Sequence, residues 1–174
     1  DGRTAMPVAA DGTAPLALVT GVTGPACRGI PSELAANGYG VIVACRPGHE
    51  LLCHNALNSA MGVEFFVEAV DLADSISVAN FLKRIRLVHG RKLKSIVNCA
   101  SVKPQEKQTS DSGVEMQFQV NVWAYYALAV HLMPVLHANS PASVVNAPSA
   151  AANYVDDKPS AFDLSDLPMR LLEH

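Results

Sequence analysis

The sequence is poor in charged and aromatic residues, and it has no long apolar run. Charged side chains make up 17% of its 174 residues and aromatic side chains 6%, with a formal net charge of −3. Domains that bind nucleic acids are usually strongly basic, so we expect no nucleic-acid partner. A helix that crosses a bilayer needs about 20 consecutive, mostly apolar residues. No run approaches that length, so we expect no membrane span.

Cysteine is also scarce, with four residues that show no paired close spacing. Disulfide frameworks in small secreted domains use regular cysteine pairs, so we expect a reduced, cytoplasmic protein. The start of the chain lacks the basic and then apolar layout of a signal peptide. Cys45, His49, Cys53 and His54 lie within ten residues, but their spacing is not that of a zinc knuckle, so we expect no metal.

The length is that of one ordinary domain, and a hydrophobic content of 49% allows a sizeable core. We expect a flexible leader at residues 1–15, a stretch rich in Ala, Gly, Pro and Thr without periodicity. One domain follows at residues 16–170. Residues 171–174 contain Leu172-Glu173-His174, which resembles the beginning of a polyhistidine tag.

Short apolar runs alternate with segments of helical spacing along this domain. The expected strands cover residues 16–19, 41–43, 63–70, 95–99 and 143–146. Four helices are expected. The first ends near Gly38, the second covers residues 48–60, the third runs from Asp74 or Ser75 to Gly90, and the fourth runs from Gly113 to His137. We expect Pro134 to bend or end the last helix.

Five strands that alternate with helices predict an α/β fold, in which a parallel sheet is covered on both faces. Right-handed crossovers then favour a doubly wound, Rossmann-like sheet of five strands in the order 3-2-1-4-5. Ligands of such sheets bind beyond the carboxyl ends of the strands. The residues that directly follow each strand are therefore the candidate site.

The first of these loops is a turn of small residues, Thr20-Gly21-Val22-Thr23-Gly24. Glycine lets backbone N–H groups approach phosphate oxygens closely, so the turn favours a dinucleotide. The following helix has two possible starts, at Pro25 or at Pro31 after Gly29-Ile30. Proline deep inside a helix costs roughly 3 kcal/mol, which makes the start at Pro31 physically attractive.

From about Ala17 to about Leu167 the sequence resembles the short-chain dehydrogenase/reductase family, in particular its retinol-dehydrogenase-like members. Thr20-Gly21 resembles the start of the family's glycine turn, and Asn98-Cys99-Ala100-Ser101 is similar to the element after its fourth strand. The segment 118–122 resembles the helix that carries the family's catalytic asparagine, and 144–149 resembles the strand that leads to its catalytic serine.

The resemblance implies an NADP-dependent oxidoreductase that interconverts an alcohol and a carbonyl compound, with NAD the less favoured cofactor and a homo-oligomer as the assembly. Asn121 and Ser149 would belong to its catalytic set. Arg46 would bind the 2′-phosphate through its planar cationic fork. The full set of implied cofactor residues is Thr20, Gly21, Thr23, Gly24, Arg46, Asp71, Leu72, Asn98 and Ala100.

For three of these residues a purely structural role is also open. Arg46 could be a solvated residue at a strand end. Asn121 could be a buried amide bonded to backbone, because buried polar groups are almost always hydrogen-bonded. Ser149 follows Pro148 and could be a turn residue.

The family's Tyr-x-x-x-Lys helix has no good counterpart in the sequence. Tyr154 and Lys158 follow Ser149 too closely to lie on a separate helix, and the intervening acidic residues suit a surface loop better. The domain is therefore expected to be incomplete at its C-terminus. We also expect the edge of the fifth strand to be shielded by the tail or by a partner chain, since bare edges invite aggregation.

Pro25 and Cys27 stand where the family's last two turn glycines fall when the loop is counted by length. Proline brings no N–H and cysteine adds a side chain at the place of phosphate approach, so cofactor affinity should be weak. This departure leaves an alternative function open. The chain could be a truncated or decayed, non-catalytic Rossmann module that binds a nucleotide or a protein partner.

Overall fold

The structure is a computed structural model that describes residues 14–24, 27–57 and 65–147. Most of the expected leader and the whole expected tag remnant lie outside these residues. Five parallel strands form one sheet in the order β3-β2-β1-β4-β5. They are β1 Leu16–Thr20, β2 Gly40–Cys45, β3 Phe65–Ala69, β4 Leu93–Asn98 and β5 Ser143–Asn146. The predicted doubly wound fold and its strand order are confirmed.

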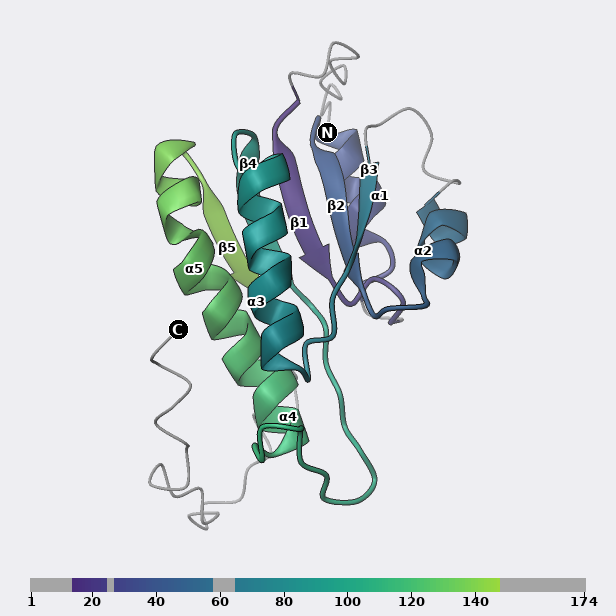
Figure 1. Cartoon of the computed structure of the whole chain (residues 1–174). Coiled ribbons are helices and arrows are strands. Elements are labelled where there is room, and N and C mark those ends of the chain that lie inside the picture. Colours follow the sequence, from purple (N-terminus) through teal and green to yellow (C-terminus); the bar gives the residue numbers. More distant parts are fainter. Residues whose placement is uncertain (1–13, 25–26, 58–64, 148–174) are drawn as a thin grey trace, which may run out of the picture.

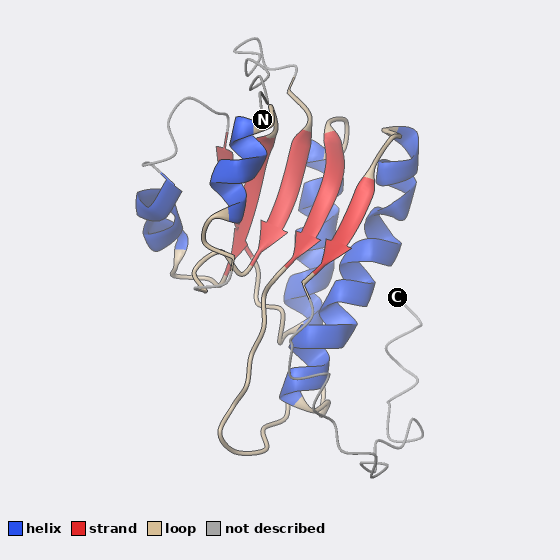
Figure 2. Ribbon diagram, turned by 180° about the vertical axis from the view of Figure 1, so that it is seen from behind, coloured by secondary structure: helices blue, strands red, loops and turns tan. Residues whose placement is uncertain are grey.

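Helices cover both faces of the sheet, as Figures 1 and 2 show from opposite sides. One face carries α1 and α2, and the other carries α3 and α5. Two helices contain π-helical turns, η1 and η2, which continue α3 and precede α5. The bounds are α1 Ile30–Ala36, α2 Glu50–Leu57, α3 Ser75–Arg84, η1 Ile85–His89, α4 Met116–Phe118, η2 Gln119–Trp123 and α5 Ala124–Ala138.

The helix starts follow the local chemistry of the sequence. Helix α1 begins at Ile30, so Pro31 lies in its first turn, where no backbone N–H is needed. Of the two starts considered, the one at Pro31 is confirmed. Asp74 caps α3, because its Oδ1 accepts a hydrogen bond from the Ile76 N–H at 2.8 Å.

Pro134 does not end the last helix, because α5 continues through it to Ala138. A proline inside a helix leaves the carbonyl four residues earlier without its N–H partner. Here that carbonyl belongs to Val130, which is 44% exposed, and Pro134 itself is exposed. Water can reach the freed carbonyl, which explains why the helix tolerates the residue.

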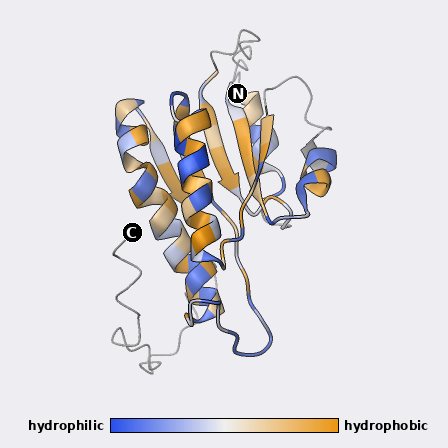
Figure 3. Ribbon diagram, viewed as in Figure 1, coloured by the Kyte–Doolittle hydropathy of each residue, from blue (hydrophilic) through white to orange (hydrophobic). Residues whose placement is uncertain are grey.

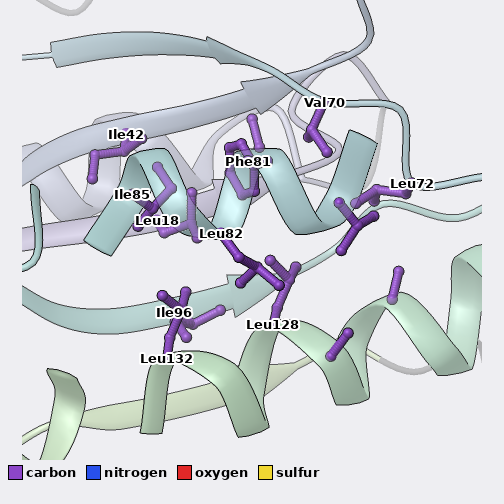
Figure 4. Packing of buried hydrophobic residues seen from close by; sticks show 14 of the residues in the cluster. Leu18, Ile42, Val70, Leu72, Phe81, Leu82, Ile85, Ile96, Leu128 and Leu132 are labelled. Carbon is purple, nitrogen blue, oxygen red and sulfur yellow. The ribbon is translucent and has the colours of Figure 1, made fainter. Parts of the chain in front are cut away.

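The larger core cluster fills the space between the sheet and the α3–α5 face. Figure 4 shows Phe81, Leu82 and Ile85 pointing between the sheet and α5, where Leu128 and Leu132 meet them. Burial of such apolar side chains is the main favourable term in folding. Figure 3 shows the strands in mostly apolar colours, while α3 alternates between apolar and polar turns.

The smaller cluster lies on the α1–α2 face and contains valines of β1, β2 and β4 together with all four cysteines. The strands β1 and β2 are buried along their whole length. Strands buried on both faces read as continuous apolar runs, which is how both appear in the sequence.

β5 is the edge strand of the sheet, and Ser143, Val145 and Asn146 are exposed on it. The tail that we expect to shield this edge begins at residue 148, outside the described residues, so this expectation stays a prediction. Among the helices that the structure describes, none combines the length and the apolar character that crossing a bilayer requires.

Leu128→Ala is expected to lower the free energy of unfolding by about 2–5 kcal/mol, because it empties a fully buried position between α5 and the sheet. Leu87→Ala is the matched control, since Leu87 is 77% exposed and its replacement should change stability by less than about 0.5 kcal/mol. Urea denaturation measures both values. Equal losses for the two variants would contradict the placement of this core.

Candidate functional site

The candidate site lies along the carboxyl edge of the sheet, where the strand ends and their loops meet (Figure 2). In the sheet register Thr20 stands opposite Ala44, and Cys45 stands opposite Ala69. The turn that begins at Gly21 therefore lies beside Arg46, and Arg46 lies beside the loop that contains Asp71. The structure thus brings most of the predicted cofactor residues to one edge.

Thr20 is fully buried at the end of β1 and bonds to the end of β4. Its Oγ1 accepts hydrogen bonds from the N–H groups of Cys99 and Ala100, each at 3.0 Å. These two N–H groups would otherwise lack a partner beyond the last ladder bond of β4. The hydroxyl of Thr20 therefore holds β1 and β4 together at the candidate site.

Gly21 allows a close approach between the first turn and the same segment of chain. Its φ is +76°, and a Cβ built on it would lie 2.5 Å from both the N and the Cα of Ala100. No side chain fits at that separation, and positive φ is unfavourable for other residues. Gly21 is thus required by packing against β4, whatever the turn binds.

The remainder of the turn is folded on itself. The N–H of Gly24 donates to the carbonyl of Gly21 at 3.1 Å, and the N–H of Cys27 donates to the carbonyl of Gly24 at 3.4 Å. Thr23 is exposed and Gly24 is partly exposed, so both are accessible from the edge. Two N–H groups that a phosphate could use are already paired inside the protein.

Arg46 and Asp71 follow β2 and β3 at the same edge. Arg46 is exposed. Asp71 is partly buried, and its Oδ1 accepts a hydrogen bond from the Ala73 N–H at 2.9 Å. Leu72 differs from both, because its side chain is 7% exposed and belongs to the larger core cluster. The side chain of Leu72 is therefore part of the core and not free to contact a ligand.

The segment after β4 is held from the helix side as well. Asn121 binds the backbone of Val102 twice, with Oδ1 accepting from its N–H at 2.9 Å and Nδ2 donating to its carbonyl at 3.0 Å. The Tyr125 hydroxyl donates to the Ala100 carbonyl at 2.6 Å. Both backbone groups of Ala100 are therefore used inside the protein. Asn121 is therefore bonded to backbone, while its catalytic role stays a prediction.

Tyr125 is a residue of this site that the sequence analysis missed, because it counts there only as part of the apolar helix face. Burial raises the pKa of Tyr125 to about 12, with smaller contributions from Cys99 and Cys27. Desolvation disfavours the phenolate, so the hydroxyl keeps its proton. Tyr125 can hold the loop after β4, but its proton is not readily given to a substrate.

Two buried amides near this edge have polar atoms without a partner among the described residues. Asn98 is fully buried, and its Nδ2 donates to Asn146 Oδ1 at 2.9 Å, but its own Oδ1 accepts nothing. Gln119 is also fully buried, with neither amide atom bonded. It opens the π-helical turn η2, and such turns occur frequently at functional sites. Nothing in the sequence pattern distinguishes Gln119.

All four cysteines are free and buried in the smaller cluster. Cys45 lies near Cys53, and Cys99 lies near Cys27. Burial is the main cause that raises the pKa of Cys45 and of Cys99 to about 12, so these thiols behave as small apolar side chains. Within the described ranges, no group of three or more potential metal ligands comes together.

Ser149 lies outside the described residues, as do Tyr154 and Lys158. The catalytic role predicted for Ser149 therefore stays a prediction. Of the predicted cofactor residues, Arg46 and Thr23 are exposed at the edge and Gly24 is partly exposed there. Thr20 and Asn98 are buried at the ends of β1 and β4.

A family model for the short chain dehydrogenases matches residues 15–161, which is most of the sequence. The chain belongs to the short-chain dehydrogenase family. The predicted resemblance is therefore confirmed, including its extent across nearly the whole domain.

Among the curated relatives, retinol dehydrogenase 13 of Mus musculus is 29% identical over 143 residues, which are 80% of this chain and 42% of that protein. Retinol dehydrogenase 13 of Homo sapiens is 30% identical over 145 residues, 80% of this chain and 43% of that protein. The chain spans less than half the length of these relatives.

Solved structures agree with the short-chain dehydrogenase fold. L-sorbose reductase from Gluconobacter frateurii, complexed with NADPH and L-sorbose, aligns with a TM-score of 0.68 at 23% identity over 82% of this chain and 55% of that one. A bulky-bulky ketone specific alcohol dehydrogenase from Comamonas testosteroni aligns with a TM-score of 0.66 at 19% identity over 81% of this chain and 57% of that one. At these identities the likeness concerns the fold.

Thr20→Val is expected to lower the free energy of unfolding by about 2–5 kcal/mol, because it leaves the buried N–H of Cys99 and the partly buried N–H of Ala100 unpaired in this short-chain dehydrogenase domain. Thr20→Ser keeps the accepting oxygen and should cost only about 1 kcal/mol, the value of one buried methyl group. Denaturant unfolding separates the two. Similar losses for Val and Ser would show that the hydroxyl contributes little.

Gly21→Ala should destabilise the protein more than Gly113→Ala, although both positions have positive φ, +76° and +78°. At Gly113 a Cβ meets nothing within 4 Å, so only the backbone cost of about 1–2 kcal/mol applies. At Gly21 the backbone of Ala100 must also shift, which should add about 1–3 kcal/mol. Thermal unfolding of both variants measures the difference, and equal melting temperatures would refute the close contact.

Proposed function

We propose that this chain is the cofactor-binding part of an oxidoreductase that uses NADP(H) and interconverts an alcohol and a carbonyl compound. The family assignment supports the general chemistry, and the position of Arg46 is the observation that supports NADP. Arg46 is exposed at the end of β2, directly beside the turn that begins at Gly21. A planar guanidinium suits bidentate binding of a phosphate.

The residues at this edge fit a dinucleotide in part. Arg46 offers charge for the 2′-phosphate, and Thr23 and Gly24 are accessible for the phosphates that join the two nucleotides. The internal hydrogen bonds of the turn remove the N–H groups of Gly24 and Cys27 from phosphate binding. Affinity should therefore depend on Arg46 more than on the turn, and it should be weak overall.

When bound, the dinucleotide supplies the hydride. The chain must then position the substrate oxygen and provide its proton. We assign the hydrogen bond to that oxygen to Ser149 and the support of the loop after β4 to Asn121 and Tyr125. Tyr125 does not supply the proton, because its hydroxyl donates to the Ala100 carbonyl and its pKa is raised to about 12.

The same observations favour a second candidate, a Rossmann module that binds a nucleotide without catalysing its oxidation. In the described part of the chain, Tyr125 is the only tyrosine bonded to a loop of the candidate edge, and it keeps its proton. The two candidates share the nucleotide site and differ only in turnover. A binding assay tests what they share, and a turnover assay separates them.

Arg46→Gln is expected to weaken NADPH binding by about tenfold to hundredfold, the value of one charge-assisted hydrogen bond. Binding of NADH should change by less than about twofold, because NADH has no 2′-phosphate. Arg91→Gln, at the opposite edge of the sheet, is the matched control and should bind both cofactors as the wild type does. Isothermal titration calorimetry measures all six affinities.

Two outcomes would count against the proposal. No saturable NADPH binding by the wild type at millimolar concentration would refute both candidates for this chain. Equal losses of NADPH and NADH affinity in Arg46→Gln would refute the assignment to the 2′-phosphate. If NADPH binds but is not oxidised with any aldehyde or ketone in a substrate panel, the non-catalytic candidate is favoured.

A further inference from the structure

The positive charge of the chain is concentrated in one short segment. Of its 13 Lys and Arg residues, six lie between residues 83 and 94, and this segment contains no Asp or Glu. The overall net charge of −3 hides this concentration. We call the segment 83–94 the basic segment. Its cations are Lys83, Arg84, Arg86, Arg91, Lys92 and Lys94.

The basic segment also carries two of the most exposed aliphatic side chains. Leu87 is 77% exposed and Val88 is 68% exposed, and both lie in η1 between the cations. Leu87 has the highest exposed fraction among the large hydrophobic residues of the described chain. Such a pair can enter an apolar phase while the cations on both sides of it bind anionic groups.

The exposure of these residues does not come from a loose helix end. Ile85 and His89, on the inner side of η1, are buried, and His89 Nε2 lies 3.0 Å from Glu68 Oε1. The next turn is tight, because a Cβ on Gly90 would lie 2.3 Å from the Arg86 carbonyl oxygen. Asn139 then binds this turn from the end of α5, with Nδ2 donating to the Gly90 carbonyl at 2.6 Å. The exposed Leu87 and Val88 are thus flanked on both sides by residues anchored to the rest of the domain.

Four of the six cations are available to an external partner. Arg84 is bound to Glu68, with Nε 3.2 Å from Oε2. In the part of the chain that the structure describes, Lys83, Arg86, Arg91 and Lys94 form no ion pair. Lys83, Arg86 and Arg91 are exposed, and Lys94 is partly exposed. The surface therefore combines unpaired positive charge with apolar side chains.

The basic segment lies at the amino edge of the sheet, the edge opposite the candidate site. The N–H of Leu16, at the start of β1, donates to the Lys92 carbonyl at 2.8 Å. Figure 1 shows the end of α3 beside the beginning of β4, away from the arrowheads of the strands. A partner bound here would leave the opposite edge open.

From this arrangement we infer that the basic segment docks the protein onto membranes that contain anionic phospholipids. The cations attract the lipid phosphates and carboxylates, and Leu87 and Val88 enter the boundary between headgroups and acyl chains. The aliphatic pair favours a lipid surface over a nucleic acid, because nucleic-acid surfaces use aromatic or hydrogen-bonding side chains beside their cations. This inference does not depend on the proposed nucleotide binding.

The test is cosedimentation of the full chain with vesicles of phosphatidylcholine and phosphatidylserine, compared with vesicles of phosphatidylcholine alone. The wild type should bind the anionic vesicles and lose binding as salt is raised, because salt screens the attraction. The variant R86Q/R91Q should bind about thirtyfold more weakly. Each cation near an anionic surface contributes about 1 kcal/mol of binding free energy, and about 1.4 kcal/mol corresponds to a tenfold change in affinity. L87S/V88S should bind about tenfold more weakly, as expected for apolar groups that enter the interface.

Two matched controls make the same kinds of substitution, two cations to Gln and two aliphatic residues to Ser, elsewhere on the surface. K103Q/K107Q removes two exposed cations in the loop before α4, and L51S/L52S replaces the exposed aliphatic pair of α2. Both controls should bind anionic vesicles as the wild type does. Circular dichroism and thermal unfolding should be unchanged in all four variants, because every substituted residue is exposed.

Three results would overturn the inference. The first is no binding of the wild type to anionic vesicles. The second is an equal loss in K103Q/K107Q and R86Q/R91Q, which would show that only overall charge matters. The third is retention of a short DNA duplex at physiological salt that is lost in R86Q/R91Q but kept in L87S/V88S. That pattern would identify the basic segment as a nucleic-acid surface instead.

Discussion

The two hydrogen bonds that the Thr20 hydroxyl accepts from the N–H groups of Cys99 and Ala100 are the contact on which the candidate edge depends. They fix the end of β1 to the end of β4, and Gly21 allows the backbones to meet. Asn121 and Tyr125 bind the same stretch from the helix side. The loop after β4 is therefore held from two directions before any ligand arrives. Arg46, which follows β2, lies outside this fixed unit and is exposed.

The architecture could be predicted from the sequence because its causes are local. Strands β1 and β2 are buried along their length and appear as short apolar runs. The handedness of crossovers then restricts the strand order to very few choices. The start of α1 was predictable for a similar reason, since Pro31 fits the first turn of a helix but not the interior of one. Pro134 could not be judged in this way, because its cost depends on whether water reaches the carbonyl of Val130.

The candidate site could be predicted only in part, because roles within it depend on contacts between distant segments. Tyr125 lies 25 residues from the carbonyl that its hydroxyl binds, and no periodicity shows such a pair. Leu72 and Thr20 belong to the matched family motifs, yet the structure buries both. Motif matching finds positions along an edge, whereas burial decides which atoms at those positions remain free. The basic segment was missed for another reason, because the net charge of the whole chain does not show where along the sequence the cations lie.

The parallel sheet places its two functional candidates at opposite ends, because all five strands run the same way. A protein resting on a membrane through Leu87 and Val88 would turn the carboxyl edge toward the aqueous phase. Water-soluble dinucleotides would then reach Arg46 by free diffusion. A substrate dissolved in the lipid would have to leave the bilayer and travel the length of the sheet, whereas a substrate from solution would meet no such barrier. The direction of the strands alone would thus select for reactants that are carried in water.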